Sequence, residues 1–333
     1  MTAATYDVLG IGNAIVDILA KTEDKFLTEQ GMAKGSMALI DEARAAAIYD
    51  AMGPATEISG GSAANTIAGV ANLGARTAFV GKVRNDQLGN VFSHDIRAAG
   101  VAFDTQAASS GQATARCYVL VSPDGERTMN TYLGAAQDLS PADIDPAQIA
   151  ASSVVYLEGY LWDPANAKEA FLKASKIAHE NKRSVALTLS DAFCVGRYRD
   201  EFLNLIRSKT VDLVFANEAE LTSLYQTEDF DKALAQLRND ATLAVVTRSE
   251  KGCVVVAKDK VTPVPAFPIK QLVDTTGAGD LFAAGFLFGL VRGLSHEQCG
   301  RFGGLAAAEV IQHIGARPQA SLKVLAQEAG LPV

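Results

Sequence analysis

After Ser140, short apolar runs alternate with longer stretches of helical periodicity. The apolar runs predict strands at residues 154–157, 185–189, 213–216 and 243–247. The longer stretches predict helices near residues 165–181, 198–208, 218–225 and 230–239. Nearly continuous apolar strands that alternate with helices are typical of a parallel sheet covered by helices on both faces. The pattern therefore predicts an α/β fold with a doubly wound, mostly parallel sheet.

Two strands near the middle of the chain do not follow this alternation. Residues 103–121 and 127–133 are joined by the turn SPDG without a helix between them, which indicates an antiparallel hairpin. We assign this hairpin to a separate small β-sheet. Residues 253–257 follow the preceding strand too closely for a crossover, so we expect an antiparallel edge strand there. The predicted domains are a large α/β domain, residues 1–14, 62–100 and 136–333, and a small lid, residues 15–61 and 101–135.

Composition narrows the class of protein. The chain has 333 residues, of which 48% are hydrophobic and 20% charged, as in a soluble globular protein. Its net charge of −8 argues against a broad surface for nucleic acid or for anionic membranes. The four cysteines form no CxxC pair and are expected to be free thiols in a reducing compartment. We recognise no signal peptide and therefore expect a cytoplasmic protein. We also expect a monomer or homodimer whose partners are small molecules.

Candidate chemistry concentrates in residues 274–280, DTTGAGD, which precede an apolar run of helical length. Glycines at 277 and 279 lack a Cβ, so the backbone can turn sharply and a ligand can come close. The amides of Gly277, Ala278 and Gly279 would then bind an anion at the helix start. Asp280 would repel that anion unless it takes a proton from a hydroxyl that attacks phosphorus. The alternative is that Asp280 only caps the helix and that the glycines only form a turn.

Other polar groups follow predicted strands. Because ligands in such folds bind beyond the carboxyl ends of the strands, these residues are expected to share one rim. They are Asn13, Gly159, Ser190, Asn217 and Thr247. Glu220, three residues after Asn217, would either close a capping box or orient a water-rich Mg²⁺ held mainly by phosphates.

Two motifs give a resemblance to a known family. GGSAAN at residues 60–65 and DTTGAGDLFAAGF at residues 274–286 resemble the two signatures of the ribokinase-like (PfkB) kinases of sugars and nucleosides. NEAE at residues 217–220 is similar to that family's NxxE element. The segments GIGN with Asp17, TLSDAF at residues 188–193 and residues 306–315 look more like the family's adenosine kinases than its ribokinases or fructokinases.

This resemblance implies an ATP-dependent phosphorylation of the 5′-hydroxyl of a ribonucleoside, with adenosine converted to AMP in purine salvage. Asp280 would be the base, and Gly277, Ala278 and Gly279 the anion hole. Asp17 would hold two ribose hydroxyls, and the groups around the sugar would be Asn13, Gly61, Ser62 and Asn65. The nucleobase would be flanked by Tyr160, Leu161 and Phe193, while Arg127 would face the phosphate from the lid.

The resemblance also implies the nucleotide and ion sites. Residues along ATP would be Asn217, Glu220, Thr247, Gly252, Thr275 and Ala307. Glu220 would act on Mg²⁺ through water, and a monovalent cation such as K⁺ would lie near Asp274 and Thr276. The chain departs from the family pattern at Arg248 and Ser249, where many relatives have a glycine, and at Leu161, where animal adenosine kinases have an aromatic residue.

Four other functions remain open from the sequence. Within the family these are a guanosine or inosine kinase and a kinase of a sugar such as ribose or fructose. Outside it, the turn at residues 10–13 resembles the start of a dinucleotide site, but an NAD-dependent oxidoreductase would need a third glycine that is absent. A non-catalytic nucleoside-binding protein would gain little from the carboxylate of Asp280.

Overall fold

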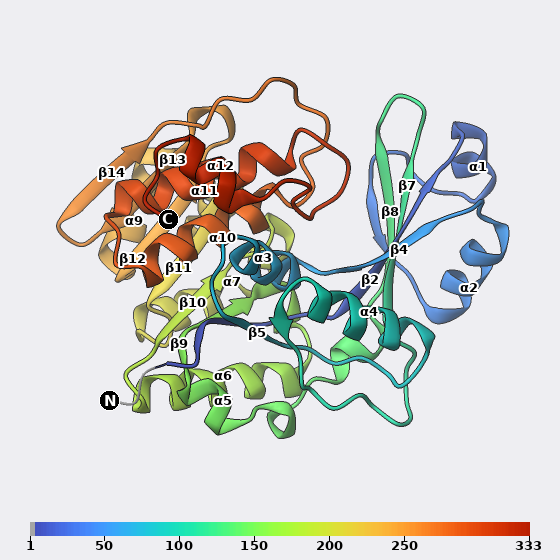
Figure 1. Cartoon of the computed structure of the whole chain (residues 1–333), viewed down its shortest axis with the longest axis horizontal. Helices are drawn as coiled ribbons and strands as arrows, with labels where there is room; N and C mark the ends of the chain where they lie inside the picture. Colours follow the sequence, from blue (N-terminus) through green and yellow to red (C-terminus); the bar gives the residue numbers. More distant parts are fainter. Residues whose placement is uncertain (1–3) are drawn as a thin grey trace.

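The computed structural model describes residues 4–333, which form two β-sheets with helices around them (Figure 1). The larger sheet has nine strands in the order β14-β13-β12-β11-β10-β9-β1-β5-β6. The smaller sheet has five strands in the order β3-β8-β7-β2-β4 and lies apart from the larger one, on the right of Figure 1. The chain passes between the two sheets several times, so each is built from segments distant in sequence.

The bounds of the elements are as follows. The large sheet contains β1 Tyr6–Ile11, β5 Thr77–Val80, β6 Val101–Ala102, β9 Ser152–Glu158, β10 Ser184–Thr188, β11 Leu213–Asn217, β12 Leu243–Thr247, β13 Cys253–Ala257 and β14 Lys260–Val264. The small sheet contains β2 Ile15–Lys21, β3 Met37–Leu39, β4 Thr56–Gly60, β7 Ala115–Val121 and β8 Arg127–Tyr132. The α-helices are α1 Asp24–Glu29, α2 Glu42–Ala51, α3 Ser62–Asn72, α4 Gln87–Ala98, α5 Pro146–Ala150, α6 Ala165–Glu180, α7 Ala192–Arg207, α8 Glu218–Tyr225, α9 Phe230–Asp240, α10 Ala278–Val291, α11 His296–Val310 and α12 Leu322–Glu328. The 3₁₀ turns are η1 Gly134–Asp138, η2 Pro141–Asp143, η3 Gly159–Trp162 and η4 Ser249–Lys251.

The large sheet confirms the predicted doubly wound architecture. From β6 to β12 every neighbouring pair of strands is parallel, and only β13 and β14 are antiparallel. β13 was predicted at the sheet edge, and this is wrong because β14 pairs with its outer side. The short strand β6 was not predicted, since two residues carry too little periodicity to be recognised.

Helices cover both faces of this sheet, and each face has its own core. Side chains of β1 alternate between the two cores: Val8 packs on one side, and Leu9 and Ile11 on the other. The first core lies under α3, α4, α10, α11 and α12, and the second under α5 to α9. Helix α10 is apolar almost all round, and its residues 281–289 are buried, as expected for a helix enclosed by other elements.

The small sheet confirms the predicted hairpin, because β7 and β8 pair antiparallel. The first strand is shorter than predicted and begins at Ala115 rather than Phe103. The preceding residues DTQAASSGQ are mostly small and polar, so they have no alternating apolar face to place on a sheet. Helices α1 and α2 lie on the side of this sheet away from the large sheet (Figure 1).

We propose that the two sheets mark two domains, with β6 added to the large one because it pairs with β5. All four cysteines are free, as predicted, and all four are buried. Among residues 4–333 there is no helix with the length and apolar character needed to cross a membrane.

Candidate active site

A cavity of about 1690 Å³ lies where the carboxyl ends of the large-sheet strands face the small sheet. Pockets for one small ligand usually measure roughly 300–1,000 Å³, so this cavity has room for two ligands. Most residues that the sequence predicted for the site line it. They are Asn13, Asp17, Gly61, Ser62, Asn65, Arg127, Tyr160, Phe193, Asn217, Glu220, Thr247, Gly252, Thr275, Thr276, Gly277, Ala278, Gly279, Asp280 and Ala307. Leu161 and Asp274 are not in the cavity wall.

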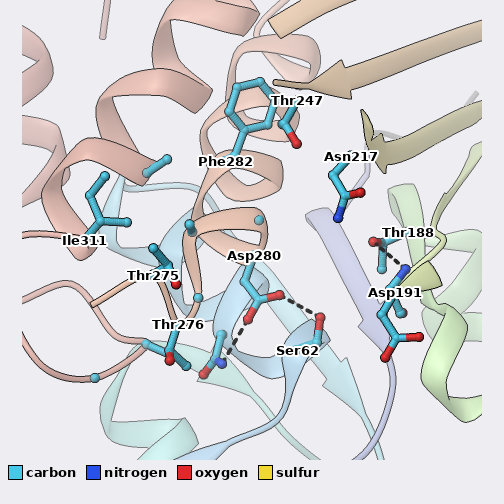
Figure 2. Close-up of a pocket in the computed structure, with 18 of the residues that line it drawn as sticks. Ser62, Thr188, Asp191, Asn217, Thr247, Thr275, Thr276, Asp280, Phe282 and Ile311 are labelled. Atoms are coloured by element: carbon cyan, nitrogen blue, oxygen red, sulfur yellow. Dashed lines mark hydrogen bonds between the residues drawn. The ribbon is translucent and has the colours of Figure 1, made fainter. Parts of the chain in front are cut away.

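Asp280 is the third residue of α10 and points into this cavity (Figure 2). Its carboxylate accepts hydrogen bonds from Ser62 Oγ at 2.6 Å and from Asn65 Nδ2 at 3.1 Å. The N-cap residue of α10 is Gly277, and no side chain within residues 4–333 caps the helix. The alternative that Asp280 only caps the helix is therefore wrong. Burial raises the pKa of Asp280, and the two hydrogen bonds and the charge of Arg317 oppose that rise.

The turn before α10 exposes backbone amides beside this carboxylate. Gly277 is the N-cap residue and has φ of 77°, in the left-handed region that glycine adopts without strain. A Cβ there would also come within 2.8 Å of Ala316. The amide of Ala278 donates to Thr275 O at 3.2 Å, whereas the Gly277 and Gly279 amides have no hydrogen-bond partner within residues 4–333. Two of the three predicted anion-hole amides are therefore free to bind a ligand.

The start of α3 forms the opposite side of the same site. Gly61 has φ of 97°, and a Cβ at this position would collide with Asn13 O. This close approach places Ser62 and Asn65 against Asp280. Asn13 lies beside them. Glu158, at the end of β9, accepts from Asn13 Nδ2 at 2.6 Å and from the Ala63 amide at 2.8 Å.

Glu158 was not predicted from the sequence as a residue of the site. Its carboxyl is almost wholly buried, and burial raises its pKa to about 7. The sequence signal that could have identified Glu158 was its position directly after the predicted strand at residues 154–157. The next residue, Gly159, was instead predicted to lie at the rim of the site. Glu158 lines the cavity, and its hydrogen bonds fix Asn13 and the first turn of α3.

Asp17, on β2, lies on the small-sheet side of the cavity. Burial raises its pKa to about 7, and the charges of Arg317 and Arg127 act against this shift. No protein group within residues 4–333 donates a hydrogen bond to its side chain or forms an ion pair with it. A carboxylate has acceptor sites on both oxygens, so Asp17 is free to accept hydrogen bonds from ligand hydroxyls.

Arg127 and Asp274 form an ion pair that the sequence did not predict. Their side chains are 8% and 7% exposed, and Arg127 Nη2 lies 2.6 Å from Asp274 Oδ2. Asp274 also accepts from the Thr276 amide at 3.0 Å and from the Gly315 amide at 3.1 Å. The carboxylate expected to bind a monovalent cation is thus engaged by a guanidinium from the lid, and Arg127 is turned to Asp274.

Asn217 and Glu220 form a capping box, which was one of the two roles predicted for them. Asn217 Oδ1 accepts from the Glu220 amide at 2.8 Å, and Glu220 accepts from the Asn217 amide and side chain. Burial raises the pKa of Glu220 to about 7, with a further contribution from the charge of Asp191. Both residues nevertheless line the cavity, where Asn217, Thr188 and Asp191 face Asp280 across the open space (Figure 2).

The predicted nucleobase residues separate into two groups. Phe193 is 69% exposed at the cavity wall, with the Arg197 guanidinium 4.7 Å from its ring, and Tyr160 is 36% exposed. Leu161 is 1% exposed and packs in the core under α5 to α9, so its predicted contact with the base is wrong. The 3₁₀ turn η3 points neighbouring side chains in different directions, which a residue-by-residue comparison cannot resolve.

The other end of the cavity is apolar. Phe282 and Ile311 lie there with Thr275 and Thr247 (Figure 2), and Ala307 and Phe267 also contribute to the wall. Arg248, one of the departures from the family pattern, turns away from the cavity. It donates to Glu218 at 3.1 Å and lies 3.7 Å above the ring of Phe230.

These features together define a class of enzyme. A carboxylate in a large cavity, next to free amides at a helix start, fits a phosphotransferase that acts on an alcohol. Residues 49–322 match the model of the PfkB family, which is described as "pfkB family carbohydrate kinase". The chain belongs to this family. The family membership excludes the NAD-dependent oxidoreductase that the sequence left open.

Solved structures and curated relatives agree with this assignment. A probable sugar kinase from Rhizobium etli is 52% identical, with a TM-score of 0.93 over 99% of this chain and 100% of that one. An adenosine kinase from Sinorhizobium meliloti is 56% identical, with a TM-score of 0.92 over 98% of this chain and 100% of that one. Adenosine kinase 2 of Arabidopsis thaliana is 29% identical over 94% of this chain and 96% of its own length.

Proposed function

We propose that the protein transfers the terminal phosphoryl group of ATP to the 5′-hydroxyl of a ribonucleoside and that adenosine is its substrate. The similarity to adenosine kinases from a bacterium and a plant supports the choice of nucleoside. The probable sugar kinase among the similar structures keeps a free sugar as the competing acceptor.

The observation that carries the proposal is the arrangement of Asp280. Ser62 and Asn65 hold its carboxylate beside the unpaired amides of the α10 start. A bound hydroxyl in this place would pass its proton to Asp280 as it attacks phosphorus. The amides and the positive end of the helix would stabilise the negative charge on the transferred group. The raised pKa of Asp280 brings its proton affinity nearer to that required of a base at neutral pH.

Asp17 supports a riboside rather than a simple alcohol as the acceptor. Its carboxylate lies in the cavity without a partner among residues 4–333, and a pair of ribose hydroxyls would satisfy both oxygens. We propose that Asn13, Gly61 and Asn65 surround the sugar and that Tyr160 and Phe193 flank the base. Phe193 provides an exposed aromatic face, and stacking on such a face is worth about 1–3 kcal/mol per base.

The apolar end of the cavity suits the adenine of ATP, with Ala307 and Ile311 along the ring. We propose that Mg²⁺ is held mainly by the phosphates and through water by Glu220. Within residues 4–333 there is no group of three or more His, Cys, Asp or Glu side chains that would hold a metal directly. At Asp274, we propose that Arg127 supplies the positive charge that a monovalent cation was expected to provide.

A substrate panel tests the proposal directly. The purified protein is incubated with ATP, Mg²⁺ and one acceptor at a time: adenosine, guanosine, inosine, ribose or fructose, with product identified by mass spectrometry. We expect AMP from adenosine with the highest kcat/KM. Faster transfer to another nucleoside or to a sugar would reassign the acceptor, and no transfer to any of the five would refute the kinase proposal.

A further inference from the structure

Arg317 was not identified from the sequence, yet it lines the cavity beside the proposed reaction centre. It lies in the loop after α11, which belongs to the large domain. Its Nη2 donates to Ser59 O at 2.9 Å and to Ser59 Oγ at 3.0 Å, and Ser59 is on β4 of the small sheet. Arg317 therefore connects the two sheets at the point where the chain leaves β4 for α3.

The segment that Arg317 holds, residues 59–62, contacts three groups of the proposed site. Gly60 packs against the carboxylate of Asp17, where any Cβ would collide with it. Gly61 lies against Asn13, and Ser62 donates to Asp280. A displacement of Ser59 would thus be transmitted to Asp17, on the side of the proposed sugar site, and to Asp280, the proposed general base.

Arg317 is also fixed from its own side of the cavity. The preceding residue, Ala316, packs on Gly277 of the anion-hole turn, and the Gly315 amide donates to Asp274. The loop 315–317 therefore contacts the turn before α10 through Gly315 and Ala316, and through Arg317 it reaches Ser59, two residues before the N-cap of α3. These non-covalent contacts link the two sides of the site.

Arg317 forms no ion pair with any residue from 4 to 333. Its Nε and Nη1 atoms are buried and have no hydrogen-bond partner in the part of the chain that the structure describes. Burial lowers the pKa of Arg317 to about 10, so it remains charged at neutral pH, and the acidic groups acting on it are Asp95, Asp17 and Asp280. An unpaired guanidinium in this place favours the ionised form of both site carboxylates.

We propose that Arg317 is a positioning residue for phosphoryl transfer, which anchors the segment 59–62 through Ser59 and holds a positive charge near Asp17 and Asp280. This inference rests on the proposed function, because Asp280 acts as base only in its ionised form. Asp95 strengthens the same anchor, since its carboxylate accepts from the Ser59 amide at 2.8 Å.

Several other groups share this electrostatic environment. Asp280 is acted on by Arg317, while its own charge acts on Asp17, Glu158, Tyr156 and Tyr160. The positive charges of Arg317 and Arg127 both act on Asp17. Arg127 is already paired with Asp274, so loss of Arg317 would leave Asp280 without a cation that opposes the effect of burial.

The test compares Arg317→Gln, Arg317→Lys and the wild type across pH. Without the positive charge the carboxylate pKa values rise, so Asp280 becomes protonated at a higher pH. We expect the kcat/KM of Arg317→Gln, relative to wild type, to fall further as the pH is lowered from 8, with a limiting loss at the acid end of about tenfold for each unit by which the carboxyl pKa rises. Arg317→Lys keeps the charge and should restore the pH profile. Arg238→Gln, an exposed arginine on α9, is the control and should follow the wild type throughout.

Thermal unfolding of the same variants gives a readout that needs no activity. Ionised Asp17 and Asp280 lose a favourable partner in Arg317→Gln, so its loss in Tm should be greater at pH 8 than at pH 5. The penalty on activity thus grows towards acid and the penalty on stability towards alkali, which a purely structural arginine would not produce. Losses in kcat/KM and Tm that are equal at all pH values would overturn the role of Arg317. An inactive wild type with the expected Tm pattern would instead refute the proposed function.

Discussion

The two walls of the cavity are built differently. On the large-domain wall the acidic groups have partners: Asp280 is held by Ser62 and Asn65, and Glu158 and Glu220 accept from neighbouring amides. On the small-sheet wall, no group in the described part of the chain forms a hydrogen bond or an ion pair with the side chain of Asp17, and the apolar side chains of Met37 and Leu39 are 49% and 54% exposed. One wall is organised before a ligand arrives, whereas the other leaves groups unsatisfied that a ligand would cover. A preorganised catalytic wall and a less satisfied binding wall fit an enzyme that closes a lid over its substrate.

The largest expected effect comes from the organised wall. Asp280→Asn keeps the size of the side chain but removes the base, and general bases contribute about 10²–10⁴-fold to rate. We expect kcat to fall about 10³-fold while the Kd for the riboside, measured by calorimetry, changes by less than about threefold. Asp259→Asn, at an exposed turn between β13 and β14, is the matched control. A kcat within tenfold of wild type would remove Asp280 as the base.

A smaller effect is expected from the unsatisfied wall. Asp17→Asn should raise KM for the riboside about 100-fold, since a charged acceptor for two hydroxyls is lost, with a lesser change in kcat.

The same substitution should stabilise the free protein at high pH. The raised pKa means that the folded state binds a proton more tightly than the unfolded state, so this carboxyl lowers stability as pH rises from about 4 to 7. Asn carries no charge, and we expect a gain of about 1–2 kcal/mol in the free energy of unfolding at pH 8 and none at pH 4, measured by urea denaturation. A loss of stability at pH 8 would show that Asp17 is satisfied in the free protein.

The contact between the small sheet and the large domain can be measured at the ion pair of Arg127 and Asp274. Removing one partner of a buried ion pair leaves the other charge unpaired, so Arg127→Gln and Asp274→Asn should each cost about 3 kcal/mol of stability. The double variant should cost about 2 kcal/mol less than the sum of the two. Additive costs would mean that the pair does not join the lid to the large domain.

The same ion pair predicts the response to monovalent cations. Because we propose that Arg127 supplies the positive charge at Asp274, we expect wild-type activity to be unchanged when K⁺ is replaced by a large organic cation.

The smallest effect is expected at the edge of the cavity. Phe193→Ala should raise KM for adenosine about 5–10-fold through lost stacking, with little change for ribose, which has no base. Because Phe193 is 69% exposed, Tm should change little. Leu161→Val is the paired comparison. Because Leu161 is a core residue, this substitution should lower Tm while leaving KM for adenosine within about twofold of wild type. Equal changes in KM for adenosine and ribose in Phe193→Ala would exclude a contact with the base.

Local sequence patterns were sufficient for the architecture. Apolar runs of strand length separated by helical periodicity predicted the parallel sheet, and the turn SPDG predicted the β7–β8 hairpin. The glycines at 61 and 277 also predicted the close approaches at the starts of α3 and α10. These features depend on neighbouring residues, so they can be recognised without knowledge of the rest of the fold.

Only the tertiary structure decided which groups meet. Glu158 supports Asn13, Arg127 pairs with Asp274, and Arg317 reaches Ser59, each across a separation of more than a hundred residues. No local periodicity carries that information. Leu161 shows the same limit at short range, because the direction of a side chain in a single 3₁₀ turn depends on what packs around it. The sequence thus determined the scaffold and the catalytic candidate, while the partners that set charge and position depended on how distant segments pack together.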